Sequence, residues 1–233
     1  NLFEIQSDIA RAITAALNAE LSNTEEYILA SIPTQSLAAY DAYLMGKQRL
    51  LGNSIEAYET ALAHFEEALS NDASFAGAYA GLCNVQLGLY GKTGDISHFS
   101  AAESACEQAL AIDANLAEVL VALGVLFHRN GDYDRAEAEH RKALDSEPHN
   151  VEAMTELGYT LANQGKLREA ETLMLKAELL QPDHWPIHDA LYAFYRQFDD
   201  QPDRYERALK HAMRVVELNP KNAAAWNNLG TAY

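Results

Sequence analysis

The fold is decided by two consecutive stretches of equal length, residues 117–150 (AEVLVALGVLFHRNGDYDRAEAEHRKALDSEPHN) and residues 151–184 (VEAMTELGYTLANQGKLREAETLMLKAELLQPDH). Their shared landmarks recur 34 residues apart: Leu123-Gly124, Ala136, Ala143 and Pro148 in the first, and Leu157-Gly158, Ala170, Ala177 and Pro182 in the second. A fixed period of this length is typical of helical repeat arrays, in which each repeat buries its apolar face against its neighbours.

Each recurring residue type has a physical reason. Glycine and alanine are small where two antiparallel helices cross closely, and proline ends the second helix because it lacks a backbone N–H. Gly131 and Gly165 lie in the turn between the helices, where we predict a positive φ. The same order returns less regularly at Leu191, Ala208 and Pro220, and a final copy begins at Trp226, Leu229-Gly230 and Tyr233.

This pattern resembles the tetratricopeptide repeat (TPR), most closely over residues 117–150, 151–184 and 223–233. The resemblance implies an all-α fold, a right-handed superhelix (α-solenoid) of antiparallel helix pairs. We predict pairs at 37–50 with 54–70 and at 75–90 with 98–112, then repeats that start at 117, 151 and 185. The second pair is lengthened, and we expect its extra residues in a loop around Gly91, Gly94 and Asp95.

The predicted array covers residues 36–233, with about four and a half to five repeats, and an amphipathic helix and linker cover residues 1–35. The segments FEIQSDIARAI (3–13) and AYDAYLMGK (39–47) also resemble bacterial regulators in which a class III nucleotide cyclase or winged-helix domain, often with a TolB-like domain, precedes a TPR array. That resemblance implies a piece of a larger signalling protein, acting as a regulatory segment intramolecularly or through self-association.

The chain is strongly acidic, with 34 Asp and Glu residues against 17 Lys and Arg and a formal net charge of −17 over 233 residues. Such a surface repels nucleic acid and anionic lipid, although it also serves plain solubility. No stretch is long and apolar enough to predict a membrane span. We expect a cytoplasmic location, or a periplasmic one if a membrane span lies upstream in the full-length protein.

The two cysteines fall within one predicted helix pair. Cys83 stands at the small position of the first helix and Cys106 at the large position of the second. We therefore expect both to be buried as inert thiols that pack like small hydrophobic residues. A disulfide is the alternative, because the two side chains face the same helix crossing.

We find no motif for catalysis, a cofactor or a metal, and predict that the chain is not an enzyme. His184 and His188 are four residues apart, but Pro186 lies between them at the start of a helix, so we interpret them as ordinary surface and packing histidines. His140 stands where the repeat has a large apolar residue, and we expect it to be buried and hydrogen-bonded.

The remaining functional surface is the concave groove, which the first helix of each repeat lines. The repeat offsets place ten candidate peptide-binding residues there: Asn84, Glu118, His128, Arg129, Glu152, Glu156, Tyr159, Asn163, Asp189 and Arg196. This mixture of acid, amide and aromatic side chains suits a peptide bound by hydrogen bonds around one aromatic anchor. Alternatively, these side chains are simply solvated and binding occurs elsewhere.

The best-known groove chemistry of the TPR family is a carboxylate clamp for an acidic C-terminal tail. Only Asn84 matches it here, because Ala80, Glu152 and Glu156 occupy positions that the clamp fills with basic residues. The resemblance therefore implies a protein-interaction scaffold without that specificity. The acidic wall of Glu118, Glu152 and Glu156 favours a basic or neutral protein or peptide partner, and a second copy of the chain is a further candidate.

Overall fold

The computed structural model describes residue 12 and residues 33–198 and 201–232, and the described residues form α-helices without any strand. The helices are α3 (Leu37–Leu50), α4 (Ile55–Asn71), α5 (Ala76–Thr93), α6 (Ile96–Ile112), α7 (Ala117–Arg129), α8 (Tyr133–Ser146), α9 (Val151–Asn163), α10 (Leu167–Leu180), α11 (Trp185–Gln197), α12 (Arg204–Leu218) and α13 (Ala223–Ala232). The predicted all-α fold is confirmed, whereas the amphipathic helix predicted near the N-terminus lies outside the described residues.

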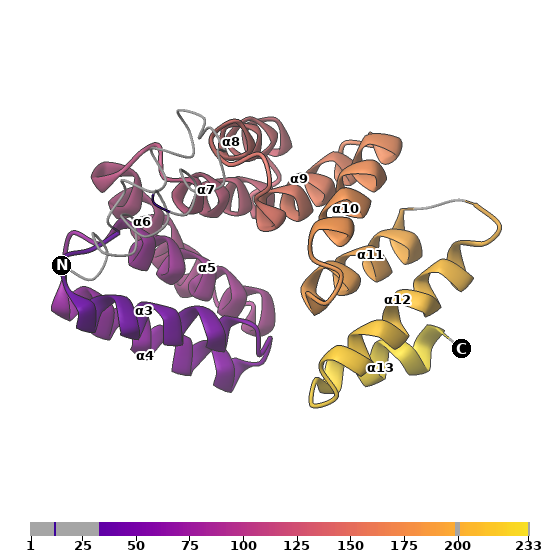
Figure 1. Ribbon diagram of the computed structural model, residues 1–233, viewed down its shortest axis with the longest axis horizontal. Helices are drawn as coiled ribbons and strands as arrows, with labels where there is room; N and C mark the ends of the chain where they lie inside the picture. Colours follow the sequence, from indigo (N-terminus) through magenta and orange to yellow (C-terminus); the bar gives the residue numbers. More distant parts are fainter. Residues whose placement is uncertain (1–11, 13–32, 199–200, 233) are drawn as a thin grey trace.

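Consecutive helices pack as pairs, and the pairs stack along an arc (Figure 1). The pairs are α3 with α4, α5 with α6, α7 with α8, α9 with α10 and α11 with α12, while α13 packs on α12. The first helices of successive pairs also contact one another, from α3 through α5, α7 and α9 to α11. The predicted repeat starts at 117, 151 and 185 coincide with the first residues of α7, α9 and α11.

The helix crossing within a pair joins a small residue on the first helix to a large residue on the second. A Cβ added to Gly158 would lie 2.7 Å from Met174 Cγ and 3.4 Å from the Ala170 carbonyl oxygen, as the predicted close packing requires. In the preceding pair, a Cβ on Gly124 would lie 2.3 Å from the His140 ring. A small residue is therefore required on the first helix, because a side chain of the second helix packs directly against the glycine backbone.

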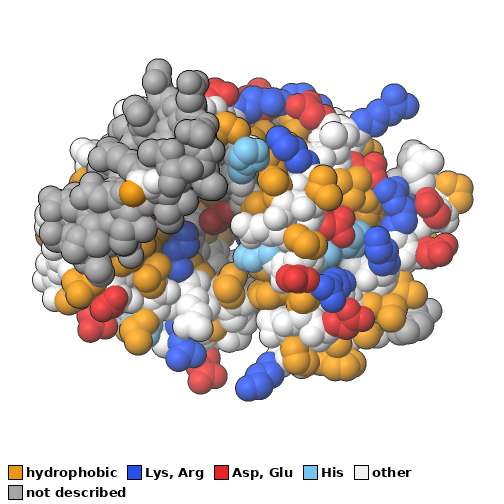
Figure 2. Space-filling model, in the orientation of Figure 1, with side chains coloured by type: hydrophobic (Ala, Val, Ile, Leu, Met, Phe, Trp, Pro, Cys, Tyr) orange, Lys and Arg blue, Asp and Glu red, His pale blue; other side chains and the backbone are white. Residues whose placement is uncertain are grey.

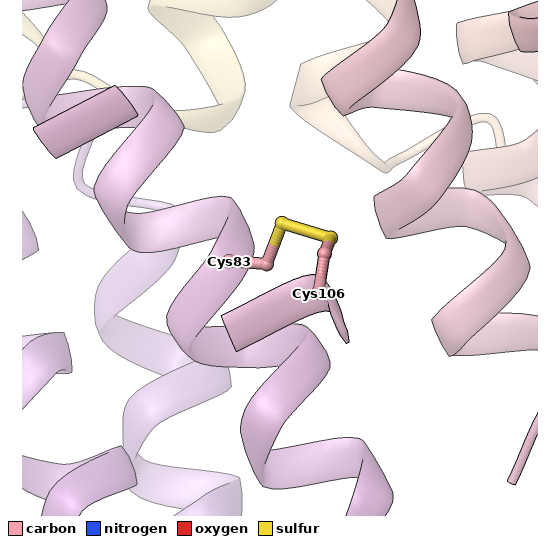
Figure 3. The surroundings of a disulfide bond; sticks show 2 residues. All are labelled: Cys83 and Cys106. Atoms are coloured by element: carbon pink, nitrogen blue, oxygen red, sulfur yellow. A yellow bond between two sulfur atoms is a disulfide. The ribbon is translucent and has the colours of Figure 1, made fainter. Parts of the chain in front are cut away.

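In the second pair, this crossing is occupied by the two cysteines. Cys83 of α5 and Cys106 of α6 form a disulfide across a Cα–Cα distance of 5.4 Å (Figure 3). The expectation of two separate thiols was wrong, and the alternative of a disulfide holds. The physical reason is the crossing itself, because two small side chains at its closest point bring their sulfur atoms within bonding reach.

The turns after α7 and α9 have the predicted conformation, whereas the connection between α5 and α6 does not. Gly131 and Gly165 have φ values of +78° and +79°, as predicted for the turns after α7 and α9. The predicted loop around Gly91, Gly94 and Asp95 was wrong, because α5 continues to Thr93 and α6 begins at Ile96. The extra residues lengthen the two helices, and Gly94, with a φ of +70°, ends α5 in the left-handed conformation.

Candidate binding groove on the inner helices

The candidate groove lies along the first helices of the pairs, where α3, α5, α7 and α9 meet. A cavity there is lined by Tyr43, Lys47, Leu50, Gly77, Ala80, Gly81, Asn84, Glu118 and Glu152. Small residues on α5 leave this space open, while charged side chains of α3, α7 and α9 surround it. In Figure 2, acidic and basic side chains lie near each other where this face of the molecule is hollowed. The groove is therefore a polar site between repeats.

Glu118 is the most strongly engaged acidic side chain of the groove. It accepts a hydrogen bond from the Tyr43 hydroxyl, and Lys47 Nζ lies 2.5 Å from its Oε1 atom. Burial opposes the charge of Lys47, but Glu118 and Glu152 outweigh it and raise the pKa of Lys47. Sequence reasoning placed Glu118 in the groove but missed both partners, which approach from a helix more than 70 residues away.

Glu152 and Glu156 follow one another on the same face of α9 and remain without an ion-pair partner among the described residues. Loss of hydration within the groove raises the pKa of Glu156 to about 7, the negative charge of Glu152 adds to the shift, and Arg129 opposes it. Loss of hydration also raises the pKa of Glu152, with Lys47 opposing and Glu118 adding. Glu156 is partly buried, whereas the Glu152 side chain is exposed to solvent, so solvent screening reduces the shift more strongly for Glu152.

Tyr159 lies one turn beyond Glu156 and is partly buried against the core cluster of α9 and α11. Burial raises the pKa of its hydroxyl, and the charges of Asp189 and Glu156 add to the shift, while Arg129 opposes it. Asn84, on α5, has a buried Oδ1 atom without a hydrogen-bond partner in the described part of the chain. Tyr159 is thus a polar group that a bound chain could contact, whereas the Asn84 Oδ1 atom is an unpartnered acceptor buried in the groove wall.

Four other predicted groove residues already have structural partners. Asp189 accepts a hydrogen bond from Asn228 at 3.2 Å, and Arg196 donates to Thr231 at 2.8 Å and to the Tyr192 hydroxyl at 2.6 Å. The Asn163 amide donates to the Tyr159 carbonyl at 2.9 Å. His128 lies 3.1 Å from the Thr160 hydroxyl, and burial followed by the charge of Arg129 lowers its pKa to about 4. His128, Asp189 and Arg196 therefore link neighbouring repeats, whereas the Asn163 bond stays within α9.

His140 corrects part of the sequence expectation. The side chain is fully buried on α8, as predicted, but neither ring nitrogen has a hydrogen-bond partner among the described residues. Burial lowers the pKa of His140 to about 3, with His128 as a smaller cause, so the ring is neutral at pH 7. The ring fills the helix crossing at Gly124 in the same way that Met174 fills the crossing at Gly158. At this position the size and shape of the side chain therefore matter more than its polarity.

Of the two histidines expected to be surface and packing residues, His188 is a buried packing residue with partners that the sequence did not indicate. It is 3% exposed, and its Nδ1 atom lies 3.1 Å from Nδ1 of His211 on α12. Glu178 of α10 lies beside both rings. Sequence spacing missed this cluster because it joins residues of two repeats across the irregular fifth copy of the pattern.

The stacked helix pairs define the chain as an α-solenoid, and comparisons with known proteins identify the kind of repeat. Residues 127–193 match the tetratricopeptide repeat family model. The solved structure of a thermophilic TPR protein from Thermus thermophilus is 21% identical with a TM-score of 0.65, covering 84% of this chain and 98% of that one. The type IV pilus biogenesis factor PilW is also 21% identical, with a TM-score of 0.54, covering 84% of this chain and 90% of its own. The fold is a TPR solenoid.

Curated relatives align over shorter parts of the chain. Human anaphase-promoting complex subunit 7 is 26% identical over 136 residues, which are 57% of this chain and 23% of that protein. The RNA polymerase-associated protein CTR9 of Caenorhabditis elegans is 33% identical over 120 residues, 49% of this chain and 10% of that protein. The chain thus spans a quarter or less of the length of these relatives. Among the described residues, no helix combines the length and apolarity needed to cross a membrane.

Proposed function

We propose that this TPR solenoid is a protein-interaction scaffold that binds an extended peptide or a segment of a partner domain along its inner groove. Two carboxylates, Glu152 and Glu156, lie on one face of α9 without an ion-pair partner within the residues that the structure describes. Loss of hydration raises the pKa of both groups, and the charges of Lys47 and Arg129 offset this only in part, so neither ionised form has a full compensating positive charge nearby. A Lys or Arg side chain from a partner would supply that charge.

The surroundings of the acidic pair suit the rest of such a segment. Tyr159 offers a partly buried aromatic ring as an anchor beside Glu156. Lys47 lines the cavity and is paired with Glu118, whereas the exposed Arg129 can donate to carbonyl groups or to single acidic side chains of the segment. Because Lys47 already pairs with Glu118, the acidic groups left for a partner are Glu152 and Glu156. We therefore infer a partner segment that is basic or neutral where it faces α9.

Selection of peptides from a random library at low salt tests this function directly. We expect basic peptides to be enriched, and Tyr159→Ala to weaken binding of a selected peptide by more than ~1 kcal/mol because aromatic anchors dominate interfaces. Glu152→Gln should mainly slow association at low ionic strength. Matched controls are Tyr205→Ala and Glu66→Gln, exposed side chains on the outer helices α12 and α4.

Equal affinity of all variants for the selected peptide would place the binding surface outside the groove. Sedimentation of the free chain tests whether the groove instead binds a second copy of the chain. In that case the chain would sediment as a dimer, and the second copy would compete with the peptide for the same face. Enrichment of acidic peptides would contradict the inferred charge preference while leaving the scaffold role intact.

We further propose that the chain works in an oxidising compartment, which favours the periplasmic alternative over the cytoplasmic expectation. The disulfide between Cys83 and Cys106 supports this, because structural disulfides persist mainly in extracytoplasmic proteins. Alkylation of the protein in intact cells, before lysis, is the test. We expect both cysteines to resist alkylation until the protein is reduced. Alkylation of both before reduction would contradict the proposed oxidising compartment.

A further inference from the structure

A second polar cluster lies away from the groove, where α10, α11 and α12 meet. A surface pocket there is lined by Glu178, Pro182, His188, Glu206, Leu209, Lys210, His211, Met213, Arg214 and Glu217. At its floor, the two histidines are 3% and 4% exposed, and the Glu178 side chain, 23% exposed, lies closer to solvent. The groove function does not use any of these residues.

Three potential ligand atoms in the pocket face one another at the spacing that a metal ion requires. His188 Nδ1 and His211 Nδ1 are 3.1 Å apart, and Glu178 Oε1 lies 3.6 Å from the first and 3.9 Å from the second. Nitrogen and oxygen ligands around a tetrahedral zinc ion lie about 3.3 Å from one another, given metal–ligand bonds of about 2.0–2.1 Å. Shifts of a few tenths of an ångström would therefore complete the geometry.

The hydrogen bond on the other side of His188 fixes which nitrogen can bind a metal. His188 Nε2 lies 2.8 Å from the Pro182 carbonyl oxygen, which can only accept, so Nε2 carries the proton. The Nδ1 lone pair of the neutral ring then points toward His211 and Glu178. A backbone carbonyl that accepts the second N–H is the usual outer support of a metal-bound histidine.

The His211 ring is also held in place. It stacks on the Tyr195 ring with a centroid distance of 5.6 Å and an interplanar angle of 23°. Tyr195 is itself fixed by hydrogen bonds to Glu171 and Arg207. Both histidines are thus oriented before any ligand arrives, as a pre-organised site requires.

We propose that Glu178, His188 and His211 bind a divalent transition metal of the zinc class, with one position left for water or another ligand. Two imidazole nitrogens and one carboxylate oxygen are a ligand set that such ions prefer. The pocket opens to solvent past Glu178, which gives the ion a path inward. Among the other lining residues, Glu217 pairs with Arg214 at 3.0 Å and so offsets its positive charge.

A metal at this position would tie two repeats together. Glu178 belongs to α10 in one helix pair, whereas His188 and His211 belong to α11 and α12 in the next. Neighbour contacts carry the stability of a solenoid, so a metal-linked interface would stiffen the C-terminal part of the array. The ion would therefore control how firmly the fifth repeat is held on the fourth.

Calorimetric titration of the full, metal-free chain with Zn²⁺ tests the proposal, and Co²⁺ spectra report the geometry. We expect one tight site per chain, a Co²⁺ absorption typical of tetrahedral coordination, and a rise in melting temperature on zinc addition. His211→Ala should weaken zinc binding by on the order of 100-fold and Glu178→Gln by about tenfold, since even loss of an outer support costs about 10–100-fold. His149→Ala removes an exposed histidine of the turn after α8 and should leave the affinity unchanged.

Two results would overturn the proposal. One is the absence of saturable Zn²⁺ binding by the wild-type chain; the cluster would then be a hydrogen-bonded histidine pair. The other is an equal affinity and Co²⁺ spectrum in the wild type, His211→Ala and Glu178→Gln. Circular dichroism of each variant checks that it is folded, and Glu178→Gln, which keeps the size of the side chain, serves as the measure if His211→Ala unfolds.

Discussion

The acidic pair on α9 predicts an unusual dependence of stability on pH, which Glu156→Gln isolates. Burial and the neighbouring Glu152 raise the pKa of Glu156 from 4.5 to about 7 in the folded protein. As pH rises, Glu156 loses its proton near pH 4.5 in the unfolded chain but only near pH 7 in the folded chain. The folded state therefore loses stability as pH rises from about 4.5 to about 7, and the full cost remains above that range.

The magnitude follows from the shift. A change of about 2.5 pKa units corresponds to roughly 3 kcal/mol at 1.36 kcal/mol per unit, and the open groove reduces this through solvent screening to about 1–2 kcal/mol. Glutamine keeps the size of the side chain and carries no charge. We therefore expect Glu156→Gln to be more stable than the wild type by about 1–2 kcal/mol at pH 8 and nearly equal to it at pH 4.5.

Urea unfolding at several pH values, followed by circular dichroism, measures the difference in unfolding free energy between the two proteins. Glu66→Gln, an exposed acidic residue on α4, is the matched control and should show no such pH dependence. A Glu156→Gln effect that is the same at pH 4.5 and pH 8 would mean that Glu156 is hydrated as in the unfolded chain, and that its pKa is not raised by burial.

Three further predictions concern the helix crossings. His140→Met, which copies the residue of the next repeat, should raise the unfolding free energy by ~1 kcal/mol at pH 7, because it removes two buried nitrogens without hydrogen-bond partners. Denaturant unfolding should show this gain growing below pH 6.5. The folded protein keeps His140 neutral down to a pKa of about 3, so the wild type loses stability as acid protonates the unfolded chain. Ala170→Leu should overpack the fully buried crossing at Gly158 and cost about 1–3 kcal/mol in the same assay, and a negligible change would contradict the repeat register. Cys83→Ala combined with Cys106→Ala should cost about 2–4 kcal/mol by releasing a link across 23 residues, and a reducing agent should then leave the double variant unchanged while it destabilises the wild type.

The repeat period predicted most of the architecture because each landmark reports a local packing constraint. The 34-residue spacing located α7, α9 and α11 to the residue, and the need for positive φ at Gly131 and Gly165 was visible in the turn composition. The loop expected around Gly91 failed because glycine is tolerated inside a helix, and only Gly94 adopts the conformation that ends one.

The candidate site was harder to predict because a repeat offset gives the face of a side chain and not its partners. Glu118 lines the cavity between the first helices, yet its hydrogen bond from Tyr43 and its ion pair with Lys47 come from α3, a distant part of the sequence. The contact between His188 and His211 depends on how the irregular fifth repeat packs, which no local pattern encodes. The cysteines could be placed at one crossing, but their oxidation depends on the compartment.

The inner face of α9 is the proposed binding surface for a basic peptide. Amide chemical-shift mapping of the labelled chain with a peptide selected from the library measures this most directly. We predict that the largest shifts fall on α7 and α9, around Glu152, Glu156 and Tyr159, and weaken as salt is added. Shifts confined to the outer helices α8, α10 and α12 would contradict the account, because binding would then occur on the convex side of the solenoid.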